Sequence, residues 1–192
     1  MYNKGIENGL KKGLRNEVIA RKIYLSFPTH VFIGQEEIEF EIKSSICSQF
    51  KLPISSIQFA GSAKPGFSYF KNRKFVPGES DLDVAIIDQG MFIKYNEIVL
   101  RETKGFKDFS SFERNENGSS NYNSYQQYIT KGIFRPDLMP KCTAKNEWFI
   151  FFNKLSGKYF ELFKDINAGI YLSEKFFEFK QADNINNYTA SL

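Results

Sequence analysis

The spacing of apolar residues along the chain predicts helices in its N-terminal quarter and again towards its C-terminus. Residues 6–25 and 34–50 carry apolar side chains every three or four positions, which is the spacing of one face of a helix. Residues 89–102, 145–157 and 174–188 are also predicted to be helical. These aromatic residues of the last two helices are expected in the core: Trp148, Phe149, Phe151, Phe152, Phe176, Phe177 and Phe179. The first two helices precede the shorter apolar runs that favour strands, and the other three lie among these runs.

The short apolar runs predict three strands. Residues 57–60 (IQFA) form a run that ends at Gly61, and residues 167–173 (NAGIYLS) form another. Residues 83–87 (DVAII) are apolar on both faces, which is typical of a strand at the centre of a sheet. We therefore predict the mixed α+β class, with a small mixed β-sheet flanked by helices.

The length and composition favour a single domain over residues 1–192, with 42% hydrophobic residues to build its core. We expect an N-terminal helical segment at 1–28 and a long polar loop or insertion at 104–128. The N-terminal helix has a basic face, and the insertion contains six aromatic residues: Phe106, Phe109, Phe112, Tyr122, Tyr125 and Tyr128. We interpret these as a solvated helix face and as packing anchors; a nucleic-acid surface is the alternative.

Charge and residue counts exclude several kinds of site. The net charge of +4 permits contact with phosphates without requiring it, and the single His30 excludes any site that needs two histidines. Cys47 and Cys142 form no CxxC motif, so we expect neither a zinc site nor a disulfide framework and favour a reduced, cytoplasmic setting. No apolar run reaches the roughly 18 residues that span a bilayer, and the N-terminus lacks the pattern of a signal peptide. We therefore expect no membrane contact.

Two acidic residues at the start of the central strand are the first candidate for chemistry. Asp81 and Asp83 are two positions apart, so strand alternation would direct both carboxylates to the same face. Like charges this close are unfavourable unless a cation neutralises them, and a hard divalent cation prefers oxygen ligands. The pair therefore predicts a site for Mg²⁺ or Mn²⁺.

A Gly-Ser pair after the preceding strand is the second candidate. Gly61 would let the backbone approach a ligand closely, and turn amides beside the Ser62 hydroxyl would hold phosphate oxygens. We predict that Lys64 contacts phosphate and that Ser80 orients the carboxylate pair. The stretch is not a P-loop, because Phe67 stands where that motif requires lysine, and the residues after Asp83 are too apolar for an EF-hand.

The Gly61-Ser62 pair followed by Ser80-Asp81-Leu82-Asp83-Val84 resembles the signature of the DNA polymerase β-like nucleotidyltransferase superfamily. The resemblance covers 59–88, about 30 of the 192 residues. It implies a small mixed sheet, two metal-binding carboxylates and a triphosphate site at Gly61-Ser62.

The chain departs from that signature in the length between its two halves. Eighteen residues separate Ser62 from Asp81, more than the family usually has. The excess carries Lys71, Arg73 and Lys74, and it is interpreted as either a solvated loop or a hairpin near the phosphates.

The second departure concerns a third carboxylate, which catalytic members of the family supply from a later strand as a base. The predicted strand at 167–173 contains no acidic residue. We choose Asp165, just before it, as the third catalytic residue beside Asp81 and Asp83. Other acidic residues nearby in sequence are Glu161, Glu174, Asp137 and Glu147.

Two functions follow from the resemblance. The first is a Mg²⁺-dependent nucleotidyltransferase that moves a nucleoside monophosphate from an NTP to a hydroxyl of RNA, a protein, a nucleotide or a small molecule. Chains of this size resemble the minimal nucleotidyltransferases of toxin–antitoxin and phage-defence modules. The second is a catalytically inactive relative that binds nucleotide or RNA, or acts as a subunit regulated by a protein partner. The intact Asp-x-Asp pair favours the enzyme.

Overall fold

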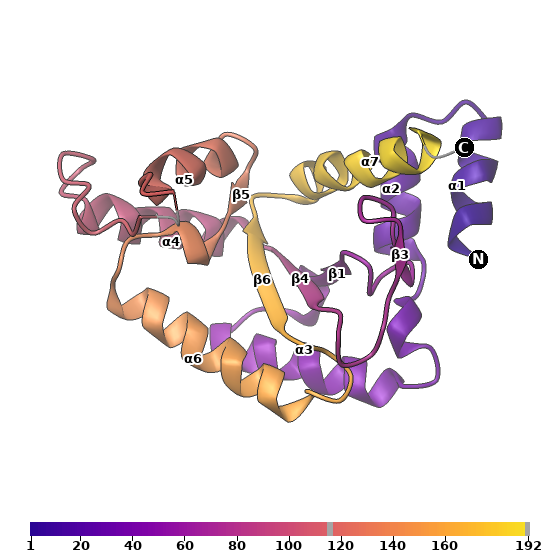
Figure 1. Cartoon of the computed structure of the whole chain (residues 1–192), viewed down its shortest axis with the longest axis horizontal. Helices are drawn as coiled ribbons and strands as arrows, with labels where there is room; N and C mark the ends of the chain where they lie inside the picture. Colours follow the sequence, from indigo (N-terminus) through magenta and orange to yellow (C-terminus); the bar gives the residue numbers. More distant parts are fainter. Residues whose placement is uncertain (115–116, 191–192) are drawn as a thin grey trace.

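The fold was analysed in a computed structural model, which describes residues 1–114 and 117–190. It belongs to the mixed α+β class, as predicted, with a four-stranded sheet and a separate two-stranded hairpin among helices (Figure 1). The α-helices are α1 (Tyr2–Lys11), α2 (Asn16–Arg21), α3 (Glu36–Phe50), α4 (Gln89–Glu102), α5 (Asn121–Ile129), α6 (Thr143–Lys158) and α7 (Glu174–Ala190). The strands are β1 (Ile57–Ala60), β2 (Phe67–Ser68), β3 (Arg73–Lys74), β4 (Leu82–Ile87), β5 (Ile133–Phe134) and β6 (Ile166–Tyr171).

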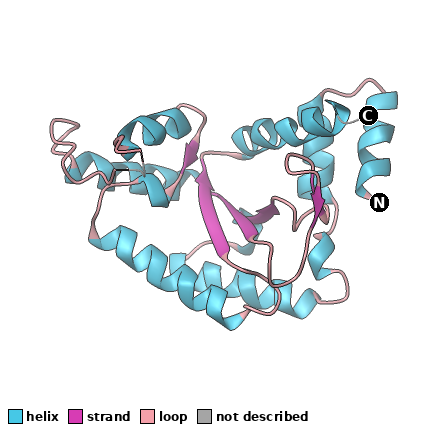
Figure 2. Ribbon diagram, in the orientation of Figure 1, coloured by secondary structure: helices cyan, strands magenta, loops and turns pink. Residues whose placement is uncertain are grey.

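The larger sheet has the strand order β1-β4-β6-β5. Strand β4 runs antiparallel to β1 and parallel to β6, and the short β5 runs antiparallel to β6 (Figure 2). The prediction that residues 83–87 form a central strand is confirmed, since β4 has a partner on each side. Short single-turn helices connect these elements, at Lys22–Ser26 (a π-turn), His30–Phe32, Ile54–Ser56 and Pro136–Leu138.

The sheet separates two hydrophobic cores. On one face, alternate strand residues such as Phe59, Val84 and Ile170 pack with α3, α4 and α6. On the other face, Ala60 and Ala85 pack with α1, α2 and α7. The side chain of Asp83 belongs to this second face by strand alternation, and its surroundings are therefore set by α7.

The N-terminal segment is broken where the apolar pattern predicted one helix over 6–25. Helix α1 ends at Lys11, and Gly13 follows it with a φ of +67°. The N–H of Gly13 donates to the carbonyl of Leu10 and that of Leu14 to Gly9, which is the Schellman pattern that stops a helix. The single prediction was wrong because a left-handed glycine interrupts the periodic pattern and redirects the chain into α2.

The polar segment 104–128 is only partly a loop. Helix α5 begins within it at Asn121, after the Ser120 side chain caps the helix by accepting from the Tyr122 N–H. Phe112 and Tyr125 are buried, and Tyr122 packs against both of their rings. These aromatic side chains therefore act mainly as packing anchors, in line with the interpretation from sequence.

The aromatic residues of the last two helices divide differently from the sequence prediction. Trp148 and Phe152 of α6 and Phe177 of α7 are buried as expected. Phe179 was also expected in the core, but its side chain is 66% exposed. It lies two positions after Phe177 on a helix, a spacing that turns it away from the buried face.

An ion pair between α2 and α7 supports the second core. The guanidinium of Arg21 donates from both Nε and Nη2 to the carboxylate of Glu178, whose side chain is only 2% exposed. We expect Arg21→Met to lower the free energy of unfolding by about 2 kcal/mol, because it leaves a buried carboxylate without its partner. Urea denaturation measures this change.

Arg101 is the matched control, because its pair with Glu102 is exposed to water. We expect Arg101→Met to change stability by less than about 0.5 kcal/mol. Equal losses for the two variants would contradict a structural role for the Arg21–Glu178 pair.

No helix in the described part of the chain is long and apolar enough to cross a membrane.

Candidate functional site

Asp81 and Asp83 lie at the entrance of β4, with Asp81 just before the strand and Asp83 in it. Asp83 is the register partner of Ala60 in β1 and of Asn167 in β6. The two neighbours fix the carboxylate between the end of one strand and the start of another. Neither aspartate forms a salt bridge within residues 1–114 and 117–190, so the pair is free of a protein cation.

Gly61 is in direct contact with the Asp83 carboxylate. Its φ of +59° lies in the left-handed region, and a Cβ atom placed on it would come within 1.9 Å of Oδ2 of Asp83. Any other residue would strain the backbone and displace the carboxylate. The Gly-Ser half and the Asp-x-Asp half of the sequence pattern therefore meet in space, with the half-buried Ser62 in the turn that follows β1.

The surroundings of Asp83 disfavour the ionised form of its carboxyl group. Water reaches the side chain, yet it lies in a concave site where protein surrounds it. Desolvation, and next the charge of Asp81, raise the pKa of Asp83 to about 6, while Lys71 and Arg135 act in the opposite direction. The pair of aspartates thus holds more negative charge than its surroundings compensate, which is the condition for binding a cation.

The raised pKa of Asp83 makes stability depend on pH. The carboxyl of the unfolded chain titrates near ~4, so its ionisation opposes folding fully above pH ~6 and not at all below ~4. We expect Asp83→Asn to be more stable than the wild type at pH 7.5, by roughly 1 kcal/mol because water screens the group. Urea denaturation of both proteins below pH ~4 and at pH 7.5 measures the stability difference between Asp83→Asn and the wild type. A difference that stays constant with pH would contradict a raised pKa of Asp83.

Lys64 and Ser80, predicted to contact phosphate and to orient the carboxylates, are both turned into the protein. Lys64 is 3% exposed, and its Nζ donates to the carbonyl of Phe27 at 2.8 Å. Burial lowers the pKa of Lys64 to about 8. The hydroxyl of Ser80 accepts from the N–H of Val76 at 3.0 Å. Both side chains hold local backbone in place, and we do not include them in the phosphate site.

Strand β6 carries an amide side chain, Asn167, and not a third carboxylate, beside Asp83. Asn167 stands level with Asp83 in β6, and both side chains are exposed on the same face. Asp165 lies outside the strand, where its carbonyl accepts from the N–H of Leu82 at 2.8 Å. Its backbone is therefore beside Asp81. Among the described residues, no three His, Cys, Asp or Glu side chains gather closely enough to hold a metal ion.

The excess between the two halves of the motif forms a hairpin, one of the two interpretations from sequence. Strands β2 and β3 pair through Phe67 with Lys74 and Ser68 with Arg73. Lys71 lies at the exposed turn, and its charge lowers the pKa of Asp83. The hairpin therefore brings a lysine to the neighbourhood of the carboxylates.

A groove of about 560 Å³ runs beside Asp83, and sequence reasoning missed most of its lining. Helix α7 contributes Lys180, Gln181 and Asn184, and the segment after β5 contributes Arg135. The Arg135 guanidinium pairs with Asp137 at 2.6 Å, donates to the Tyr128 hydroxyl at 3.1 Å and lies over the Tyr128 ring. Polar residues at i, i+1 and i+4 on one face of α7 were the only local signal for this wall.

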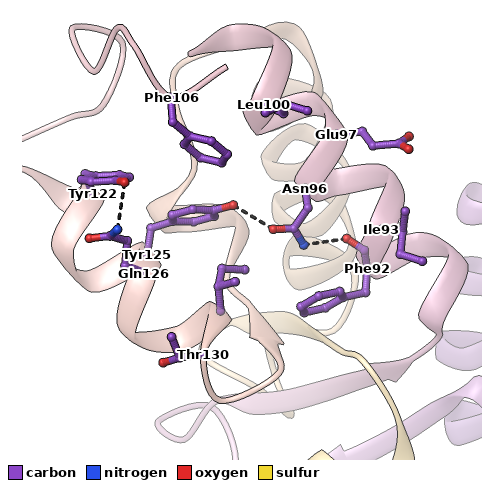
Figure 3. A pocket seen from close by; sticks show the side chains of 11 residues that line it. Phe92, Ile93, Asn96, Glu97, Leu100, Phe106, Tyr122, Tyr125, Gln126 and Thr130 are labelled. Atoms are coloured by element: carbon purple, nitrogen blue, oxygen red, sulfur yellow. Dashed lines mark hydrogen bonds between the residues drawn. The ribbon is translucent and has the colours of Figure 1, made fainter. Parts of the chain in front are cut away.

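A second, larger pocket of about 660 Å³ lies between α4 and α5, away from the carboxylates (Figure 3). Its inner polar groups satisfy one another, since the Tyr125 hydroxyl donates to Asn96 and the Asn96 amide donates to the carbonyl of Phe92, each at 2.8 Å. The remaining lining is mostly apolar, as at Ile93 and Leu100, but it also includes the polar residues Glu97, Gln126 and Thr130. Glu97 is the only charged residue among those that line this pocket, so the lining has neither a carboxylate pair for a metal nor a cation for phosphates.

Comparison with known proteins adds no relative: no protein-family model matches the chain, and no curated protein or solved structure does.

Proposed function

We propose that the chain is a Mg²⁺- or Mn²⁺-dependent nucleotidyltransferase, which moves a nucleoside monophosphate from an NTP to a hydroxyl acceptor. The observation that carries the proposal is the contact between Gly61 and the Asp83 carboxylate, next to Asp81. A turn able to hold phosphates and a carboxylate pair able to hold a metal are thereby adjacent, although 18 residues separate Ser62 from Asp81 in sequence.

The residues present fit a divalent cation in part. Asp81 and Asp83 supply two oxygen-bearing side chains; burial, and next the charge of Asp81, raise the pKa of Asp83, and a cation would offset both effects. When bound, the metal neutralises phosphate charge and aligns the attacking and leaving oxygens. Gly61-Ser62 would receive the outer phosphates, and Lys71 would add charge from the hairpin. Asp165 remains the predicted base, with its backbone beside Asp81.

Binding without transfer is the second candidate function, and one observation favours it. Asn167 occupies the position level with Asp83 in the adjacent parallel strand, and an amide can neither accept a proton at neutral pH nor add charge to a metal site. In that case the domain would bind NTP or RNA, or act as a partner-regulated subunit.

Transfer of label from each α-³²P NTP to RNA, protein and small-molecule extract, with Mg²⁺ or Mn²⁺, separates the two functions. We expect wild type to transfer label and the Asp81→Asn/Asp83→Asn double variant to lose at least 100-fold in rate, as expected for loss of metal-centred charge stabilisation. Glu97→Gln, which removes an exposed carboxylate of α4 that lines the other pocket, is the control and should keep full activity.

The same proteins are tested for NTP binding by calorimetry. NTP binding that depends on Asp81 and Asp83, without transfer to any acceptor, would favour the binding domain. If the wild-type protein neither binds an NTP nor transfers label, both proposed functions are wrong.

A further inference from the structure

Strand β6 has an unpaired edge beside the carboxylates. Strand β5 covers only its last two residues, through Phe134 with Ile170 and Ile133 with Tyr171. Residues 166–169 pair with β4 on one side, and on the other side they pair with no strand of the part of the chain that the structure describes. An open edge presents main-chain donors and acceptors to any extended chain.

The hydrogen-bond alternation of β6 identifies the free groups. The carbonyl of Tyr171 accepts from Asp88 after β4, whereas the N–H of Leu172 donates to Gly132 before β5. Odd-numbered residues therefore bond towards β4 and even-numbered ones towards β5, so the N–H and C=O of Ala168 point to the uncovered side. No hydrogen bond joins them to the residues that the structure describes.

The sequence explains why β5 stops short of Ala168. Continuing the register from Phe134 opposite Ile170 would place Pro136 opposite Ala168. Proline has no N–H to donate to the Ala168 carbonyl, and the chain turns there into the short helix Pro136–Leu138. At the far end of the edge, the N–H of Ile166 is satisfied by the Ser156 hydroxyl at 2.8 Å. The unpaired part of the β6 edge therefore lies between Ile166, whose N–H is bonded to Ser156, and Ile170, which pairs with β5.

The two walls of the groove along this edge differ in polarity. Helix α6 provides Phe149 and Phe152 on the side of the first core, and helix α7 provides Lys180, Gln181 and Asn184 on the other side. A strand laid on the edge would direct the side chain level with Ala168 to the aromatic wall, and the side chains before and after it to the polar wall. The groove therefore fits an extended peptide in which apolar and polar residues alternate.

The polar wall of the groove is also the face of Asp83. A peptide strand on the edge would be one strand from Asn167 and two strands from Asp83, or about 10 Å from the latter at ~4.8 Å per strand. A side chain of the peptide, the Asp83 side chain and a phosphoryl group between them would together fill a distance of that size. A hydroxyl side chain on the peptide would thus face the carboxylates across the phosphate.

We infer that the open edge of β6 binds an extended peptide by strand addition and, if the proposed function holds, that a serine, threonine or tyrosine hydroxyl of that peptide is the acceptor. The hydroxyl oxygen would bond to the α-phosphorus while the bond from that phosphorus to the bridging oxygen breaks. Pyrophosphate leaves with the electron pair, and the hydroxyl proton passes to Asp165, the predicted base, whose backbone lies beside Asp81. The product is a phosphodiester between the peptide side chain and the nucleoside.

The strand-addition step is tested with a pool of N-acetylated, C-amidated hexapeptides in which valine or leucine alternates with serine, threonine or tyrosine. Hydrogen exchange of the protein amides is followed by NMR. We expect the Ala168 amide to exchange at least tenfold more slowly with peptide than without it, whereas the amide of Asn72, at the turn of the β2–β3 hairpin, is unchanged. Peptides N-methylated on the bonding edge should give no protection.

Two results would overturn the inference: no peptide of the pool protects Ala168 at millimolar concentration, or the N-methylated peptides protect it equally. Dimerisation of the protein with protection of Ala168 in the absence of peptide would also overturn it, because a second copy would then occupy the edge.

Label transfer separates this inference from the proposed function. With α-³²P NTP, label on hydroxyl peptides but not on their alanine counterparts supports both. Protection of Ala168 without any labelled product supports strand addition and overturns the transferase. Label on RNA or small molecules, with no protection of Ala168, supports the transferase and overturns the peptide acceptor.

Discussion

Replacing Gly61 by alanine is expected to lower the free energy of unfolding by at least about 3 kcal/mol and to abolish NTP binding. A non-glycine residue in the left-handed region loses about 1–2 kcal/mol. The new Cβ would also come within 1.9 Å of Oδ2 of Asp83, so the carboxylate or the end of β1 has to move. Urea denaturation measures the first effect and calorimetric titration with an NTP and Mg²⁺ the second.

Gly34 provides the matched control for Gly61. Its φ is +80°, and no atom lies within 4 Å of a Cβ built there. Gly34→Ala should therefore show the backbone strain alone, about 1 kcal/mol. In the double variant Gly61→Ala/Asp83→Ala the clashing carboxylate is absent, and we expect much of the additional loss to disappear. Equal losses for the two single variants would mean that Gly61 matters only for its dihedral angle.

Replacing Asn167 by aspartate is expected to increase Mn²⁺ affinity at least tenfold. The new carboxylate would stand level with Asp83 on the adjacent strand, giving three acidic side chains at one edge where hard cations prefer several charged oxygen ligands. Without metal, the added repulsion should lower stability by roughly 1 kcal/mol. Mn²⁺ titration followed by electron paramagnetic resonance measures the affinity.

Asn153 of α6 is the control for this charge change. It lines the same groove but lies on a helix, outside the register of Asp83. Asn153→Asp adds the same negative charge and should change Mn²⁺ affinity less than threefold. If both variants gain affinity equally, the effect is one of net charge, and the alignment of Asn167 with Asp83 has no special role.

Elements with a strong local pattern could be predicted from the sequence. The bounds of β1 and α4 match the expected 57–60 and 89–102, because an alternating or helical pattern ends there at a clear signal such as Gly61. That Gly61 and Asp83 belong to one site was implied by the family resemblance, but the antiparallel pairing that brings them into contact was not predicted. The break at Gly13 was not predicted, because the sequence alone does not show whether a glycine within a periodic apolar pattern ends the helix or continues it.

Features that depend on tertiary contacts were not predicted. Helix α5 has a polar, Asn-rich sequence and is held by the aromatic contacts of Tyr125 with Phe112 and Phe134. Strand β5 is only two residues long and exists through its pairing with β6. The groove beside Asp83 draws on α5, α6, α7 and all four strands of the larger sheet, so no window of sequence contains it. Its polar residues on α7 acquire a role only through the fold.

The placement of the groove between two cores has a consequence for local unfolding. Helix α6 belongs to the core on one face of the sheet and helix α7 to the core on the other. Each core is a candidate cooperative unit that opens and closes with its own free energy. A ligand held by both walls binds only when both units are closed, and so it would make them exchange their amide hydrogens as one unit. Ligand binding in the groove would then slow the hydrogen exchange of backbone amides far from it, on α1 and α3.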